Sequence, residues 1–247
     1  MNFLSLIKRK ILFKLKKKIS IDKEILLNKN LDELFYHYGS DKAENVRRTG
    51  KKGHGYSKYY DNHFKEIKNN KINILEIGSY AGRSAAAFSK YFTNSKIFCF
   101  DINISNFLFS SKQIEVFGLD INDKNRVKKY FNIINQKYGF KNFDLIIDDG
   151  SHNLSDILFS LNFFFKYLNN NGIYVIEDFK FPNYYDYNKN VDDILIDELL
   201  TNIIDKRTFK SSIINEQDQM YLFNNIKKID MYRGNLSDSD ICFIRKK

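Results

Sequence analysis

The chain has 247 residues, 43% of them hydrophobic, so it can bury a full core and is not a disordered chain. Its two cysteines, Cys99 and Cys242, both lie inside apolar runs, which excludes a disulfide framework or thiolate metal site and fits a reducing cytoplasm. The net charge is +10, but seven lysines and arginines fall within the first 18 residues. Without those seven charges the rest of the chain has a net charge of +3, which is too low to indicate a surface that binds nucleic acid.

Residues 1–30 are predicted to carry a basic amphipathic helix. Leu4, Ile7, Ile11 and Leu15 recur at helical spacing among lysines, with no acid between them. The apolar stretches are too interrupted to span a membrane, and no signal-peptide cleavage site follows. Two interpretations stay open: residues 1–18 contact an anionic membrane at its inner face, or the helix packs on the body or on a partner subunit.

Residues 31–70 are predicted to be a helical preface with a lid loop. One helix includes Leu31 to Phe35, and a second runs from about Ser57 to Lys68. The loop between them combines glycines, charges and aromatics, which is typical of a lid over a site, although a surface segment without a role is the alternative. Its basic residues favour a phosphorylated or nucleotide-linked acceptor. The candidate substrate contacts are Tyr38, Asp41, Lys42, His54 and Tyr56, and the basic residues are Lys42, Arg47, Arg48, Lys51 and Lys52.

A strand from Ile72 to Ile77, a glycine turn and a helix from Ala85 to Phe92 follow. This order lets a ligand approach the backbone at a helix N-terminus. The spacing is E-x-G-x-x-x-G rather than G-x-G-x-x-G, and Glu76 would repel a phosphate, so a cationic or amino-bearing ligand is favoured. The next strands, 96–101 and 114–120, end in Asp101, suited to a ribose diol, and in Asp120, placed to meet an adenine amino group.

The run from Phe143 to His152 is apolar at first and then carries two acids, a glycine and an imidazole. It reads as a buried parallel strand whose carboxyl end is where open α/β sheets bind ligands. Glu177 and Asp178 close another apolar run in the same way, which predicts a metal site with a base beside it. Oxygen ligands without cysteine favour Mg²⁺ or Mn²⁺ over zinc. In the alternative, His152 caps the helix that begins near Leu154 and the acids bond backbone amides or solvent.

The remainder is predicted to complete the sheet. We expect helices at 155–168 and 192–205, a turn at 169–172, a strand at 220–223, and a terminal hairpin of 229–232 with 240–245. The aromatic loop after Asp178, including Phe181 and Tyr184, is suited to stacking on a sugar or base or to packing on its neighbours. Strand–helix alternation with no second catalytic domain predicts one Rossmann-like α/β domain over residues 71–247.

These motifs resemble class I S-adenosylmethionine (SAM)-dependent methyltransferases from about Leu31 to the C-terminus, and more narrowly the metal-dependent sugar O-methyltransferases of the macrocin and mycinamicin type. The resemblance implies a seven-stranded, mostly parallel sheet with an antiparallel last strand and helices on both faces. It also implies Mg²⁺ or Mn²⁺ on Asp149, Glu177 and Asp178, with His152 as the catalytic base. The implied SAM contacts are Glu76, Gly78, Ser79, Arg83, Asp101, Asp120 and Asp148.

The sequence therefore predicts transfer of a methyl group from SAM to a sugar hydroxyl. The expected acceptor is a nucleotide-activated sugar, a surface-polysaccharide (capsule or lipooligosaccharide) precursor or a glycosylated natural product. The expected setting is a homo-oligomer, dimer or tetramer, in the cytoplasm. Alternatives are a nucleotide-sugar oxidoreductase or epimerase and a methyltransferase of a non-sugar natural product. Modification of nucleic acid is disfavoured because the chain has no N-P-P-aromatic motif. A non-enzymatic scaffold docked on a membrane is disfavoured because it would not explain the acids at successive strand ends.

Overall fold

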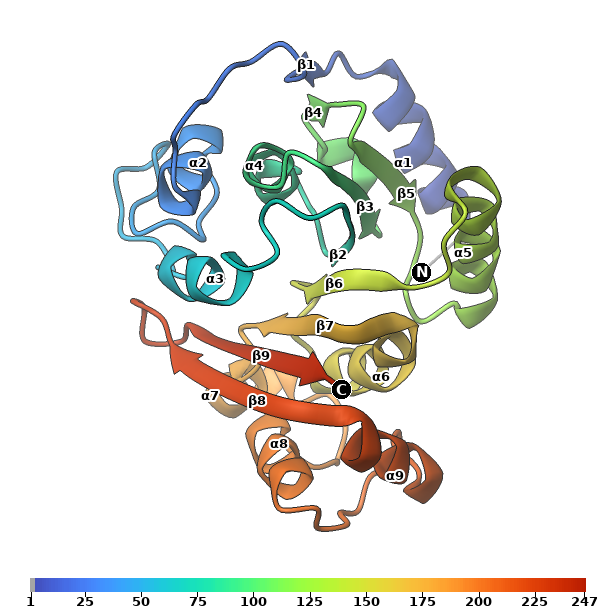
Figure 1. The fold of residues 1–247 in the computed structure, drawn as a ribbon. Helices are drawn as coiled ribbons and strands as arrows, with labels where there is room; N and C mark the ends of the chain where they lie inside the picture. Colours follow the sequence, from blue (N-terminus) through green and yellow to red (C-terminus); the bar gives the residue numbers. More distant parts are fainter. Residues whose placement is uncertain (1–2) are drawn as a thin grey trace. The chain divides into compact units, whose positions relative to one another are not determined.

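The structure is a computed structural model that describes residues 3–247, and its chain divides into two compact units. The first unit is residues 1–141 and the second is residues 142–247 (Figure 1). This boundary does not coincide with the predicted limits at residues 30 and 70. The predicted N-terminal segment also includes residues 1 and 2, which lie outside the described residues.

The first unit contains a parallel three-stranded arrangement. Strand β3 pairs with β2 on one side and with β5 on the other, in the order β5-β3-β2, as the buried apolar runs predict. A short parallel pair, β1 with β4, lies apart from it. The elements of this unit are α1 (Phe3–Leu15), β1 (Ile19–Ser20), α2 (Leu31–Tyr38), α3 (Ser57–Phe64), β2 (Ile72–Ile77), α4 (Arg83–Tyr91), β3 (Ser95–Asp101), η1 (Ile104–Asn106), β4 (Phe109–Ser110), β5 (Ile114–Gly118) and α5 (Lys124–Tyr138).

Local sequence signals fix the helices of this unit. A capping box of Asn30 and Glu33 begins α2, and Gly39 ends it in the left-handed conformation. Gly82 begins α4 at φ 71°, and a Cβ there would lie 2.3 Å from the Phe107 ring, so only glycine fits this turn. The core between α2, α3 and α4 is aromatic, with edge contacts among Phe35, Tyr60, Phe64 and Phe88.

Helix α1 packs on the rest of the first unit. It contacts η1 and β5, buries Leu6, and places Phe13 edge-on against Phe107. These contacts confirm the interpretation that the predicted N-terminal helix packs on the body. The helix itself ends at Leu15, well before residue 30.

The second unit adds four strands in the order β6-β7-β9-β8. Strands β6 and β7 are parallel, β9 is antiparallel to β7, and β8 is antiparallel to β9, which confirms the predicted terminal hairpin. The elements are β6 (Phe143–Asp148), α6 (Leu154–Phe164), η2 (Phe165–Tyr167), β7 (Leu168–Glu177), α7 (Phe181–Tyr184), η3 (Asp186–Asn188), α8 (Ile196–Ile204), α9 (Glu216–Asn225), β8 (Ile226–Arg233) and β9 (Asp240–Lys246).

The predicted fold class is confirmed, as mixed α/β with a seven-stranded, mostly parallel sheet and antiparallel pairing at its last strands. Three local predictions were wrong. Residues 220–223 lie in α9 and not in a strand, because Asn215 caps a helix there. Residues 169–172 belong to the start of β7, with a register shift opposite Phe143–Leu145. The helix predicted for 57–68 ends at Phe64.

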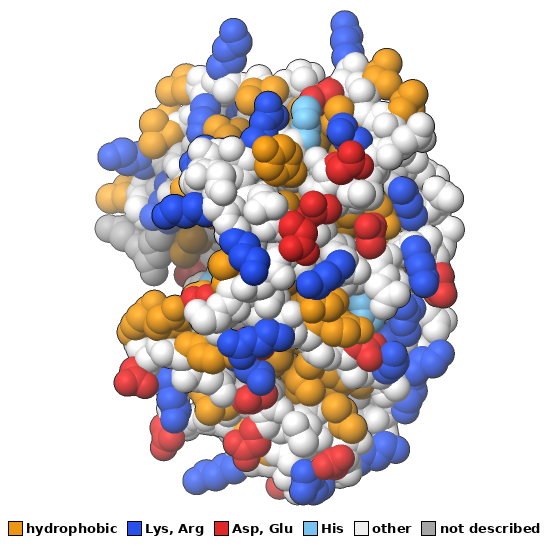
Figure 2. Space-filling model, turned by 90° about the vertical axis from the view of Figure 1, so that its left-hand side faces the viewer, with side chains coloured by type: hydrophobic (Ala, Val, Ile, Leu, Met, Phe, Trp, Pro, Cys, Tyr) orange, Lys and Arg blue, Asp and Glu red, His pale blue; other side chains and the backbone are white. Residues whose placement is uncertain are grey.

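On the face drawn in Figure 2, Lys and Arg side chains lie interspersed with carboxylates and do not gather into one basic stripe. Within residues 3–247, no helix combines the length and the apolar character needed to span a bilayer.

Candidate functional site

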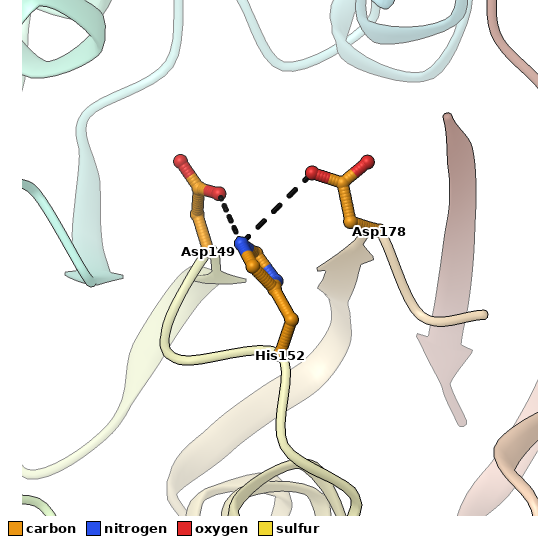
Figure 3. Close-up of side chains that lie close together, drawn as sticks. All are labelled: Asp149, His152 and Asp178. Atoms are coloured by element: carbon orange, nitrogen blue, oxygen red, sulfur yellow. Dashed lines mark ion pairs between the residues drawn. The ribbon is translucent and has the colours of Figure 1, made fainter. Parts of the chain in front are cut away.

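Three polar side chains converge in the second unit at the carboxyl ends of β6 and β7. Asp149 follows β6, Asp178 follows β7, and His152 lies in the loop before α6 (Figure 3). The His152 Nε2 atom is 3.8 Å from Asp149 Oδ1 and 3.9 Å from Asp178 Oδ2. Among the described residues these three offer ligand atoms that all lie within 4.8 Å of one another. The imidazole therefore stands between two carboxylates.

The backbone at this cluster is strained. His152 has φ 56° and Asp178 has φ 50°, a left-handed conformation that side-chain-bearing residues seldom adopt. Each such residue costs on the order of 1–3 kcal/mol and persists only where its surroundings hold it, most often at functional sites. Two of the three cluster residues therefore have this strained backbone conformation, one in the loop after β6 and one after β7. Residues whose only role was to form a turn would not require such strain.

Asn188 holds the His152 turn in place. Its Nδ2 donates to the backbone carbonyl of His152 at 3.1 Å, to that of Ser151 at 3.4 Å and to Asn153 Oδ1 at 3.3 Å. Asn188 is buried at the end of η3, so these bonds are shielded from water. The alternative in which His152 caps α6 is wrong, because Asn153 is the N-cap residue and it is Asn190 Oδ1 that accepts from the Ser155 amide in the first turn, at 3.1 Å.

Asp148 lies behind the cluster rather than in it. It is buried, and burial raises its pKa to about 6, although hydrogen bonds from Ser160 and from the Gly150 amide oppose the shift. The Tyr174 hydroxyl lies 3.5 Å from its Oδ2 and 2.7 Å from the Ser160 hydroxyl. Asp148 thus anchors the turn that presents Asp149, and its contact with a cofactor stays a prediction.

Glu177 takes a different position from its neighbour Asp178. It is the last residue of β7, is buried, and its backbone remains in register with Ile241 of β9, whereas Asp178 has left the strand. Of the described acids, Asp149 and Asp178 join His152 in the three-residue cluster, and Glu177 does not. The side-chain cluster therefore contains two of the three predicted metal ligands, Asp149 and Asp178, together with the predicted base.

The donor set fits a divalent cation. Two carboxylates and an imidazole are ligands that Mn²⁺ accepts, and the carboxylates alone suit Mg²⁺. Neighbouring ligands of an octahedral ion of this size are about 3 Å apart. The spacings of 3.8 and 3.9 Å around His152 are slightly wider, so small side-chain rotations would bring the same atoms to coordination distance. The cluster therefore passes the test of geometry for such an ion.

The first unit gathers the other predicted site residues at the carboxyl ends of β2, β3 and β5. Glu76 is buried at the end of β2, and the amide of Gly78 donates to Phe100 of β3. Asp101 accepts from the Tyr80 amide at 2.7 Å, and its carbonyl accepts from the Leu119 amide at 3.0 Å. These bonds join the glycine turn to the ends of β3 and β5.

The same turn contains Tyr80, another side-chain-bearing residue in the left-handed conformation. Tyr80 has φ 42°, between Gly78 at 82° and Gly82 at 71°, and its side chain is 65% exposed. Ser79 is buried, and its hydroxyl donates to the Glu76 carbonyl at 3.3 Å. Asp120, which also accepts from the amide of Asn122, is half-buried two residues after β5 ends. The residues are thus placed at adjacent strand ends, as the sequence predicts for a nucleoside-type ligand.

The predicted lid loop is tied to this turn through Arg83. Arg83 Nη1 donates to the Tyr38 carbonyl at 2.8 Å. Burial lowers the Arg83 pKa and the charge of Arg48 lowers it further, while Asp41 opposes the shift. The loop folds back on itself, with the amide of His54 donating to the Asp41 carbonyl at 2.7 Å.

Most of the predicted substrate-contacting side chains of the lid loop pack against other residues of the first unit. Lys42 and Tyr56 are buried, and His54 is half-buried with its ring against Tyr56. Tyr38 is buried, and its hydroxyl donates to Glu24 Oε2 at 2.7 Å. Asp41 alone among the five is exposed. Four of the five side chains are therefore buried or half-buried, and contact with a substrate stays a prediction for all five.

Aromatic rings lead away from His152 in the second unit. Phe181 lies 5.0 Å from the imidazole, Tyr185 5.2 Å from Phe181, and Tyr187 5.5 Å from Tyr185, all measured between ring centroids. Tyr184, a predicted contact, donates to Asp240 and is 37% exposed. The sequence prediction selected Phe181 and Tyr184 as contacts and included Tyr185 in the aromatic loop suited to stacking, but it gave no role to Tyr187 or Asn188. The tyrosine-rich composition of residues 184–187 was the available signal for Tyr187, and nothing near Asn188 indicates its role.

Comparison with known proteins gives relatives of one kind. No protein-family model matches the chain. A mycinamicin VI 2''-O-methyltransferase from Micromonospora griseorubida is 30% identical over 132 residues, which are 51% of this chain and 31% of that protein. An L-olivosyl-oleandolide 3-O-methyltransferase from Streptomyces antibioticus is 31% identical over 155 residues, which are 60% of this chain and 36% of that protein. The matches thus span about a third of these relatives.

A solved structure agrees in fold. The mycinamycin pathway methyltransferase MycE, in complex with Mg, SAH and mycinamycin VI, superimposes with a TM-score of 0.66 at 24% identity, covering 89% of this chain and 55% of MycE. Two further MycE structures give TM-scores of 0.62 and 0.65. The predicted resemblance is confirmed: the chain has the fold of class I SAM-dependent methyltransferases, and its relatives in sequence are macrolide sugar O-methyltransferases.

Proposed function

We propose that this chain transfers a methyl group from SAM to a sugar hydroxyl and requires Mg²⁺ or Mn²⁺. The observation that carries the proposal is the cluster of Asp149, His152 and Asp178, in which an imidazole stands between two carboxylates on strained backbone. The relatives that are named sugar O-methyltransferases support the reaction class. The MycE structures that contain Mg and SAH support the cofactors.

The metal ligands in this proposal are Asp149 and Asp178, with Glu177 beside them. A divalent ion bound there would lower the pKa of an acceptor hydroxyl and orient it. His152 accepts the hydroxyl proton at Nε2 as the oxygen attacks the methyl carbon of the sulfonium. The bond from that carbon to sulfur breaks, its electron pair stays on sulfur, and S-adenosylhomocysteine leaves. Asn188 keeps the imidazole of His152 oriented throughout.

Residues of the first unit bind SAM in this proposal. Glu76 and the turn at Gly78 and Ser79 receive the methionine portion, whose amino group is cationic. Asp101 accepts hydrogen bonds from the ribose diol, and Asp120 accepts from the adenine amino group. Their support is the placement of all three acids at the ends of adjacent parallel strands.

The acceptor in this proposal is a carbohydrate, as a nucleotide-activated sugar or a precursor of capsule or lipooligosaccharide. The ring row of Phe181, Tyr185 and Tyr187 supports it, because apolar sugar faces stack on aromatic rings. The exposed cations Arg48, Lys51 and Lys52 of the lid loop suit a phosphorylated acceptor. We also propose a cytoplasmic homo-oligomer, dimer or tetramer, that works at the inner face of the membrane, where such precursors are assembled.

An acceptor screen tests this function. The full chain is incubated with SAM, Mg²⁺ and a panel of nucleotide sugars and glycans, and products are read by mass for the gain of one methyl. We expect methylation that EDTA abolishes and that Asp149→Asn reduces on the order of 10²-fold or more. Asp144→Asn is the matched control, because Asp144 lies at the opposite end of β6, where its carboxylate accepts from Asn169 Nδ2 at 2.7 Å. Calorimetry that finds NAD bound and SAM not bound would contradict the proposal.

A further inference from the structure

We propose that helix α1 and the adjoining part of α5 form a docking surface for anionic phospholipid, here called the α1–α5 surface. Both helices belong to the first unit and lie side by side in Figure 1. Lys10 Nζ of α1 donates to the Tyr130 hydroxyl of α5 at 2.8 Å. The inference rests on the surface of this unit and not on the proposed methyl transfer. The residues of the surface are Leu4, Ile7, Lys8, Lys10, Ile11, Lys14, Leu15, Arg126, Lys129 and Tyr130.

One face of α1 is fixed to the unit, partly by its cations. Arg9 Nη1 donates to the Ile102 carbonyl at 2.9 Å, and Lys16, just beyond the helix, donates to the carbonyls of Ser105 and Asn106 at 3.1 Å. Leu6 and Phe13 fill the space between these contacts. The helix is therefore anchored by polar groups as much as by apolar ones.

The opposite face of α1 presents its apolar side chains to solvent. Leu4 is 69% exposed, Ile11 52% and Leu15 78%, and Ile7 and Leu12 flank them. At 100° per residue these positions share one side of the helix, opposite Leu6 and Phe13. A helix whose only task was to cover the core would place these residues inward. A contiguous apolar face of this kind in water indicates a surface that contacts something else.

The charge around this face selects an anionic partner. Lys8 and Lys14 border the apolar side chains and are exposed, and no acid occurs before Asp22. Helix α5 also contains no acid between Lys124 and Tyr138. Aliphatic residues framed by lysines match a helix that lies in the plane of an anionic bilayer. A second copy of this chain is a poorer partner, because a two-fold contact would place lysines against lysines. Nucleic acid is also a poorer partner, because it would not bury the exposed leucines.

A cavity beside the apolar face gives the lipid headgroup a place. Its volume is about 240 Å³, and its lining contains three cations, Lys10, Arg126 and Lys129, beside the Tyr130 ring and hydroxyl. Arg126 also pairs with Asp123, at 3.5 Å. The remaining lining residues are Leu6 and Ile7 of α1, so the cavity borders the apolar face directly. A phosphate at this cavity would keep the attached acyl chains over Ile7 and Ile11.

Vesicle flotation with the full chain tests the inference without any methylation assay. Vesicles of phosphatidylcholine alone are compared with vesicles that contain 30% phosphatidylglycerol. Three variants accompany the wild type: Ile11→Asp with Leu15→Asp for the apolar face, Lys10→Glu with Lys129→Glu for the cavity, and Ile204→Asp as control. Ile204 is 52% exposed, as Ile11 is, but belongs to α8 of the second unit. Far-ultraviolet circular dichroism checks that each variant is folded.

We expect wild type and Ile204→Asp to bind the anionic vesicles at least tenfold more strongly than the neutral ones, with binding weakened by salt. Each of the two α1–α5 variants should lose at least tenfold of that binding. Equal binding to both vesicle types, or unchanged binding by the Ile11→Asp, Leu15→Asp variant, overturns the inference. Sedimentation without lipid tests the other possible partner, a second copy of this chain. If the Ile11→Asp, Leu15→Asp variant is a monomer while the wild type is an oligomer that does not bind vesicles, the surface is a subunit contact and the inference is overturned.

Discussion

At the scale of single residues, His152 stands between two carboxylates and beside the Phe181 ring. The position suits a base next to a bound cation, and it also suits a third ligand. The two roles differ in what removing the imidazole does. A base affects the reaction rate alone, whereas a ligand also affects the affinity for the ion.

We expect His152→Ala to lower the methyl-transfer rate by about 10²- to 10⁴-fold, the usual contribution of general base catalysis. The dissociation constant for Mn²⁺ should change less than threefold. A rate that rises with pH in the variant, as hydroxide replaces the imidazole, would support the role. If Mn²⁺ affinity falls in step with the rate, His152 is a ligand and not the base.

Asn188 is a positioning residue that acts through His152. We expect Asn188→Ala to lower kcat by about tenfold while KM for SAM stays unchanged, because the lost hydrogen bonds orient only the His152 turn. Leaving the buried carbonyls unpaired should also cost about 1–3 kcal/mol of stability. Asn188→Asp should be no better than Asn188→Ala, because a carboxylate cannot donate to those carbonyls.

The control is Asn183→Ala, since Asn183 is exposed and its side chain bonds only Asp197 among the contacts resolved for it. A loss of stability in Asn188→Ala with kcat and its pH profile unchanged would reduce Asn188 to a structural residue.

At the scale of elements, Glu24 joins the chain segment after β1 to α2. It accepts from Tyr38 at 2.7 Å and lies 2.6 Å from His37 Nε2. Burial raises the Glu24 pKa, but these hydrogen bonds and the charges of His37 and Lys90 outweigh burial, so the pKa lies below its ordinary value of 4.5. A carboxyl group of this kind stabilises the fold above pH 4.5, and that stability is lost as the pH falls through the lowered pKa.

Glu24→Gln should therefore destabilise the chain by roughly 1 kcal/mol at pH 7 and by less at pH 3, because the advantage of the wild-type carboxylate is lost as the pH falls through its lowered pKa. Urea unfolding at both pH values measures the difference. Glu66→Gln, at an exposed position, is the control. An equal destabilisation at pH 7 and pH 3 would mean that the charge of Glu24 contributes nothing.

The strands were the elements that the sequence predicted best. Apolar runs that end in an acid at Glu76, Asp101 and Asp148 are strands that end at or next to those residues. The run at Met220–Phe223 looks similar but lies in α9, because Asn215 caps the helix and only Leu222 and Phe223 of the run face inward. Four apolar residues satisfy a strand and one helix face alike, so local capping decided the outcome.

At the scale of the whole molecule, the candidate SAM residues other than Asp148 belong to the first unit and the metal cluster to the second. The acids of both could be selected from sequence because strand ends are recognisable. The residues that support them could not be selected in this way. Asn188 is 36 positions from His152 and Tyr174 is 26 positions from Asp148, and neither residue belongs to a recognisable sequence pattern. The N-terminal helix was also predicted, but which of its faces is exposed depended on the contacts of Arg9 and Lys16.

The central claim is that Asp149 and Asp178 bind a divalent cation beside the His152 imidazole. Electron paramagnetic resonance titration of Mn²⁺ into the full chain tests it directly, with Asp178→Asn compared against Asp144→Asn. We expect one Mn²⁺ per chain in the wild type and in Asp144→Asn, and an affinity at least about tenfold lower in Asp178→Asn. A wild type that binds no Mn²⁺, or an Asp178→Asn variant that binds it equally well, would contradict the account.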